Sequence, residues 1–204
     1  MDLERVEKEL KKRWETSYNW GRKQSDDWDK KSNFIYTTYS YKKLLERTEK
    51  LSIELKNYAL NRWYNYWSAK AVESIFTTHK NIIAQRNVYD KLVDFTINNI
   101  PFDHKTTVFP KGFKKDIAYA IKHKKELITW LYNNQSQQGR KHLKNRLFVV
   151  LYDDTTKQHW KMKAEINCLK FEIEKYISNF SKKSLTTLNL GEGSILSDIV
   201  WIKK

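Results

Sequence analysis

The chain has 204 residues and a mass of 24.7 kDa, which suits one domain able to bury roughly 70% of its unfolded surface without disulfides or metals. Its single cysteine, Cys168, excludes an intrachain disulfide and a cluster of thiolate metal ligands. The run of about 20 apolar residues that a membrane helix needs is missing, and the charged start MDLERVEKELKKR does not resemble a signal peptide. We therefore expect a soluble, cytoplasmic protein with no membrane partner.

The net charge of +15 at pH 7 favours a polyanionic partner, because binding of Lys and Arg to phosphates releases counterions. Only eight of the 39 basic residues are arginines, however, and a lysine excess can also reflect genome composition. Charge alone therefore leaves nucleic-acid binding open.

The amino-terminal part of the sequence has the spacing of helices. Residues 2–20 carry apolar side chains at helical intervals, and residues 21–32 are polar and turn-like. The helical pattern returns over residues 41–79, where a break is expected near 48–53 because one helix of nearly forty residues is improbable. This part also holds many aromatic residues, which we interpret chiefly as core residues, with base stacking as the alternative.

The second half alternates between strand-like and helix-like segments. In chain order we predict strands over 87–97 and 100–108, a helix over 114–134, a strand over 146–153, a helix over 161–180 and a closing strand over 194–202. This order predicts an α/β fold with a small mixed sheet flanked by helices. Residues 1–55 are expected to form an amino-terminal helical arm, and residues 56–204 the core with a carboxyl-terminal helix and strand.

The segment VDFTINNIPFDHK (93–105) predicts a β-hairpin whose turn is Asn98-Asn99, because asparagine tolerates the positive φ of two-residue turns. With this turn, Phe95 faces Phe102 and enters the core. Asp94 then faces Asp103 in a pair without mutual hydrogen bonds, where side chains lie closest. The resulting polar face of the hairpin carries both aspartates, and Lys105 follows on the same face.

Two carboxylates placed directly opposite each other repel unless a cation neutralises them. Mg²⁺ prefers one or two carboxylates together with water and phosphate, so we interpret Asp94 and Asp103 as metal ligands, with Lys105 orienting the attacking water. The acid-x-Lys spacing occurs four times in this lysine-rich chain and has no value by itself. The alternative is a solvated strand face with an Asp–Lys pair.

The arrangement D94-x8-D103-H-K105, preceded by a helix and followed by a helix and a strand, resembles the PD-(D/E)XK nuclease superfamily, to which many restriction endonucleases belong. The resemblance covers residues 60–155 and implies a restriction-endonuclease-like mixed sheet. It also implies a Mg²⁺ ion, with Mn²⁺ as a substitute, held by Asp94, Asp103 and the backbone carbonyl of His104. The implied activity is hydrolysis of double-stranded DNA by a type II restriction endonuclease acting as a homodimer.

Further residues enter through the same resemblance. Members often carry an acid on the preceding helix, which here would be Glu73, although its place opposite the apolar stripe suits solvent equally well. Asp90 shares a face with Asp94 and is a candidate auxiliary acid. The residue before Asp94 is Val93 where the superfamily motif has proline, which weakens the resemblance slightly.

A basic segment precedes the strand at 146–153 and could contact backbone phosphates, the alternative being a solvated basic turn. Its members are Arg140, Lys141, Lys144 and Arg146. Two other functions remain open for the whole chain: a nucleic-acid-binding protein without catalysis, and an RNA-directed nuclease with the same fold.

Overall fold

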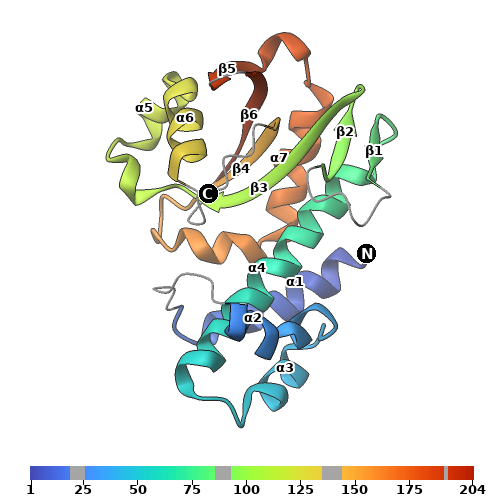
Figure 1. Cartoon of the computed structure of the whole chain (residues 1–204), viewed down its shortest axis with the longest axis vertical. Helices are drawn as coiled ribbons and strands as arrows, with labels where there is room; N and C mark the ends of the chain where they lie inside the picture. Colours follow the sequence, from blue (N-terminus) through green and yellow to red (C-terminus); the bar gives the residue numbers. More distant parts are fainter. Residues whose placement is uncertain (19–25, 86–92, 135–143, 191–192) are drawn as a thin grey trace.

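The structure is a computed structural model, and it describes residues 1–18, 26–85, 93–134, 144–190 and 193–204 (Figure 1). The α-helices are α1 Leu3–Lys11, α2 Asp26–Lys31, α3 Tyr41–Thr48, α4 Ile53–Thr77, α5 Ile117–Lys122, α6 Lys124–Asn134 and α7 Ile166–Ser178. The strands are β1 Ile82–Ala84, β2 Phe95–Ile97, β3 Ile100–Val108, β4 Arg146–Tyr152, β5 Thr186–Leu190 and β6 Gly193–Lys203. Short 3₁₀ turns are η1 Lys12–Glu15, η2 Asn33–Tyr36, η3 Lys111–Phe113, η4 His159–Ala164 and η5 Lys182–Ser184.

The strands form one mixed sheet in the order β1-β2-β3-β4-β6-β5. The pairs β3–β4 and β4–β6 are parallel, and the other neighbours are antiparallel. A parallel pair needs a crossover connection, and α5 and α6 supply it between β3 and β4. The predicted α/β class with a mixed sheet flanked by helices is therefore confirmed.

Side chains of β4 alternate between two hydrophobic clusters, one on each face of the sheet. Leu147, Val149 and Leu151 join the larger cluster with α1, α4 and α7. Phe148 and Val150 join a smaller cluster with α6. Because both faces are covered, β4 is an uninterrupted apolar run, as expected for a central parallel strand.

The amino-terminal helices pack into the larger cluster. Val6, Ile35 and Leu44 share it with residues of the sheet, and the expected division at residues 55 and 56 falls inside α4. Figure 1 shows α1, α2 and α3 gathered around the part of α4 that lies away from the sheet. Residues 1–55 are thus joined to the rest of the fold through α4 and shared apolar contacts.

Ion pairs join α1 to the end of the chain. Lys11 Nζ lies 2.9 Å from Glu165 Oε2, and Lys204 Nζ lies 2.7 Å from Glu165 Oε1. Glu7 Oε2 accepts a hydrogen bond from the Asn167 backbone at 3.1 Å. The residues before α7 and at its start therefore connect the first helix with the carboxyl terminus.

The predicted break in the long helical segment is confirmed. Helix α4 begins after Ser52, whose side chain accepts a hydrogen bond from the Leu55 N–H at 3.3 Å and so satisfies one of the free donors of the first turn. Among the described residues, neither this helix nor any other is both long and apolar enough to cross a bilayer.

Several predicted boundaries were wrong. The helix expected over 2–20 ends at Lys11 and continues only as η1, because the buried Arg13 turns its guanidinium onto the backbone carbonyls of Thr16 and Ser17. The helix expected over 114–134 is interrupted at His123, which has a non-helical ψ of 47°. Helix α2 lies in the segment expected to be a turn.

The sheet also holds strands that the sequence pattern did not predict. Strands β1 and β5 are the two edge strands, and they contain only Ile82–Ala84 and Thr186–Leu190. The strand expected over 87–97 is observed only at Phe95–Ile97, and residues 86–92, including the candidate Asp90, lie outside the described residues.

Candidate functional site

The predicted hairpin is confirmed around its turn. Asn98 and Asn99 have φ values of 47° and 65°, as a two-residue hairpin turn requires. The observed pairs are Phe95 with Phe102, Thr96 with Pro101, and Ile97 with Ile100. Phe95, Ile97 and Phe102 are buried in the larger hydrophobic cluster, so the apolar face of the hairpin is the one expected.

The regular pairing ends at Asp94, and the predicted direct pairing of Asp94 with Asp103 is replaced by a bulge. The Asp94 N–H bonds to the Phe102 carbonyl at 2.9 Å, although the strand partner of Phe102 is Phe95. The Asp103 N–H points the other way, toward β4, and bonds to the Asn145 carbonyl at 3.0 Å. Asp94 and Phe95 thus both lie opposite Phe102, as in a β-bulge, and the bulge redirects the Asp94 side chain.

The redirected carboxylate of Asp94 is held by His104. Asp94 Oδ2 accepts the His104 backbone N–H at 2.7 Å and lies 2.8 Å from the ring Nδ1. The ring is buried and lies nearly parallel to the Phe95 ring, with centroids 5.9 Å apart. The ring therefore lies on the apolar side of the hairpin, and the sequence pattern did not predict its contact with Asp94.

The environment of Asp94 favours its charged form. Burial opposes ionisation and raises its pKa, but the hydrogen bonds from the His104 side chain and backbone, together with the positive charge of Lys105, outweigh it and set the pKa below its usual value. Asp94 Oδ1 makes no hydrogen bond to the described residues. One carboxylate oxygen of Asp94, Oδ2, is thereby fixed by His104.

Asp103 is buried among three cationic groups. Arg146 Nε lies 2.9 Å from Oδ2, while Lys105 Nζ and Lys144 Nζ lie 3.3 Å and 3.4 Å from Oδ1. The Arg146 guanidinium lies 5.2 Å from the centre of the Tyr132 ring, which holds it from the α6 side. Burial of a carboxylate needs such compensation, and here the parallel pairing of β3 with β4 supplies it.

Lys105 pairs with Asp103. Its ammonium contacts Asp103, and its positive charge also helps to lower the pKa of Asp94. About half of its side chain is exposed, in contrast to the buried Asp103. Within the described residues, the ladder between β2 and β3 ends at the pair of Phe95 with Phe102.

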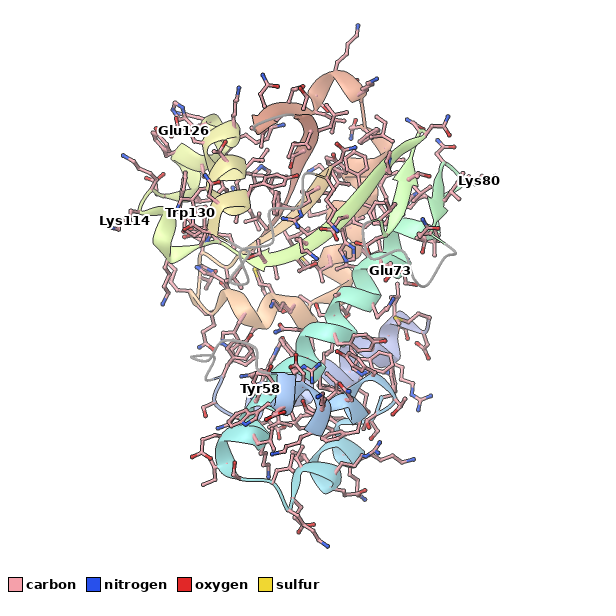
Figure 2. The ribbon with its side chains drawn as sticks, in the orientation of Figure 1. Tyr58, Glu73, Lys80, Lys114, Glu126 and Trp130 are labelled. Carbon is pink, nitrogen blue, oxygen red and sulfur yellow. The ribbon has the colours of Figure 1, made fainter. Side chains whose placement is uncertain are left out.

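Glu73 lies on the part of α4 that runs toward the strands (Figure 2). It forms an ion pair with Lys70 at 2.7 Å. Burial lowers the pKa of Lys70, but Glu73 and, more weakly, Asp94 raise it above its usual value. The partner of Lys70 in the described structure is therefore the helix acid, Glu73. The i, i+3 spacing of Lys70 and Glu73 on a helix could have predicted this ion pair from the sequence.

The carboxylates and carbonyl expected to hold Mg²⁺ are of the right chemical type, since hard cations take oxygen ligands. In a strand, the N–H and C=O of one residue point to the same side of the strand. The His104 N–H donates to Asp94, so the His104 carbonyl also lies on the Asp94 side of β3. Asp103 Oδ1 carries only the longer lysine contacts, and those side chains can move aside. Among the described residues Asp94 and Asp103 make no direct contact: Asp103 projects from the face of the sheet that α6 covers, whereas Asp94 contacts the His104 ring, which stacks on Phe95 on the other face.

Two of the four residues of the basic segment pair with Asp103. Lys144 and Arg146 direct their side chains to Asp103, and Arg146 is only 7% exposed. Arg140 and Lys141 lie outside the described residues. The sequence suggested phosphate contacts for Lys144 and Arg146 and did not predict that they contact Asp103. That contact arises because β4 pairs with β3, which brings together residues far apart in the chain.

In comparisons with known proteins, the chain matches no protein-family model, no curated protein and no solved structure.

Proposed function

We propose that this chain is a Mg²⁺-dependent nuclease that hydrolyses phosphodiester bonds in DNA, of the type II restriction endonuclease class. The observation that carries the proposal is the half-exposed Lys105 paired with the buried Asp103 on β3, beside the hairpin bulge that holds Asp94. The order of helix α4, the β2–β3 hairpin, helices α5–α6 and strand β4 agrees with the PD-(D/E)XK arrangement and gives further support.

In the proposed reaction Asp94, Asp103 and the His104 carbonyl would hold the cation, with Glu73 as a further acid. A divalent cation bound there would polarise the phosphate and activate a water molecule. Lys105 would orient the attacking water and offset negative charge growing on the phosphate. Arg146 would hold the Asp103 carboxylate in place, and His104 would hold that of Asp94.

The test is cleavage of plasmid DNA with Mg²⁺ or Mn²⁺ by the parent protein and two variants, Asp94→Asn and Lys105→Ala. Lys105 is half exposed, so its truncation should leave the fold intact and lower the cleavage rate by about a hundredfold or more. Lys80→Ala is the matched control, since Lys80 is an exposed lysine near β1, away from the acids (Figure 2).

Each alternative has its own outcome in this assay. Binding without cleavage, unchanged in both variants, would replace the proposal with a nucleic-acid-binding protein. Cleavage of RNA but not DNA would keep the site and change the substrate. Equal cleavage by the parent protein and Lys105→Ala would remove the proposed role of Lys105. A homodimer belongs to the same proposal, and the mass in solution, measured by light scattering with and without DNA, tests it.

A further inference from the structure

A second basic region lies on the α5–α6 side of the molecule, separate from the acids. An open depression of about 970 Å³ is lined by η3, α5 and α6. Figure 2 shows Lys114, Glu126 and Trp130 grouped on this side, well away from Glu73. Its principal lining residues are Phe113, Lys115, Lys122, Lys125, Trp130 and Asn133.

Trp130 is held rigidly in the wall of this depression. The Phe113 ring meets it edge-on, with centroids 6.3 Å apart. Gly112 passes so close that a Cβ atom there would lie 2.9 Å from Trp130 Cζ2, so only glycine fits without a shift. The indole is partly exposed where it lines the depression. A fixed and partly exposed indole is a suitable surface for stacking a planar ring.

The lysines around the depression are largely uncompensated. Lys115, Lys122 and Lys125 are exposed, and within the described ranges no carboxylate lies at ion-pair distance from any of them. The lining acid Glu126 accepts a hydrogen bond from the Tyr119 hydroxyl at 3.0 Å. By contrast, Lys124 is committed to the buried Asp198 at 2.6 Å. The rim therefore presents a net positive charge to solvent.

The depression lies on the same side of the sheet as the side chains of Asp103 and Lys105. The side chains of Asp103 and Lys105 point to the face that α6 covers, since their strand partners are Arg146 and Phe148, and Phe148 packs in the α6 cluster. The two regions are thus joined along α6: Trp130 lines the depression, and two residues later Tyr132 lies beneath Arg146.

We propose that this depression binds single-stranded nucleic acid, with phosphates on Lys115, Lys122 and Lys125 and a base stacked on Trp130. Lysines that follow a phosphate backbone, together with an aromatic ring for a base, form the general pattern of single-strand binding. The site would hold a strand on the side of the sheet from which Asp103 and Lys105 project. The inference does not require hydrolysis.

The test is fluorescence anisotropy of a labelled single-stranded oligonucleotide in EDTA, so that cleavage plays no part. Lys122→Glu with Lys125→Glu should lower affinity at least tenfold. It should also reduce the slope of log affinity against log salt by about 1.4, given about 0.7 per phosphate contact. Trp130→Phe, which keeps an aromatic ring beneath Gly112, should lower affinity severalfold. The matched control is Lys42→Glu with Lys43→Glu, an exposed pair on α3.

Unchanged affinity and salt slope in the α5–α6 double variant, or an equal loss of affinity in the α3 control, would overturn the inference. So would duplex binding as tight as single-strand binding with no effect of Trp130→Phe. Competition by polyglutamate as strong as that by an unlabelled oligonucleotide would overturn it as well. Lys105→Ala separates this inference from the proposed nuclease activity, because it should abolish cleavage and leave binding at the depression intact. Loss of binding in the α5–α6 variant supports the inference whether or not the parent protein cuts DNA.

Discussion

Replacing Arg146 by methionine tests whether the buried cations hold Asp103 in place. The side chains of Arg146 and Asp103 are only 9% and 5% exposed, and their contact is 2.9 Å long. Removing one partner of a buried ion pair typically costs about 3–5 kcal/mol, because the other charge stays buried. Lys105 and Lys144 remain near Asp103, so we expect the lower end of this range, about 3 kcal/mol.

For a domain of this size that loss corresponds to a fall of roughly 6–12 °C in Tm. Urea unfolding followed by circular dichroism would measure it, with Arg146→Lys as the control that keeps the charge but not the guanidinium geometry. A double-mutant cycle with Asp103→Asn should give a coupling of at least about 1 kcal/mol. If the unfolding free energy of Arg146→Met is within about 0.5 kcal/mol of that of the parent protein, the ion pair does not stabilise the fold as stated.

The hairpin and the charge of Asp94 give two further predictions. Asn99→Ala should cost about 1 kcal/mol in urea unfolding because Asn99 has a φ of 65°, whereas Asn99→Gly should cost nothing; equal stabilities would contradict the strain argument. The pKa of Asp94 is lowered in the folded state, so its contribution to stability is fully present above the ordinary value of 3.8 and is lost as the pH falls through the folded value. Asp94→Asn should therefore flatten the acid side of the stability–pH curve, and an unchanged acid side would exclude this role for the Asp94–His104 contact.

Local chemistry made the hairpin predictable. Asparagine tolerates positive φ, and strict alternation places Phe95 and Phe102 on one face, so the turn and its first pairs follow from sequence alone. The same reasoning failed at Asp94, because a bulge inserts one extra residue there and shifts the register of the pairing. The contact of Asp94 with His104 arises from that irregularity.

The contacts of Asp103 could not be predicted from the sequence, for a different reason. Its partners Lys144 and Arg146 come from a parallel strand about forty residues later, and parallel pairing has no local turn that would set its register. A buried run such as β4 predicts a strand but not its neighbours. The edge strand β1 was missed because three residues are too few for periodicity to be recognised.

The ion pairs around Glu165 have a consequence for how the protein folds. Lys11 in the first helix and Lys204 at the opposite end of the chain both contact Glu165, and Asn167 reaches back to Glu7. Helix α1 can pack on α4 early, but its contacts with Glu165 and Asn167 require a segment more than 150 residues later in the chain. Closure of such sequence-distant contacts is slow, so we expect them to form late in folding.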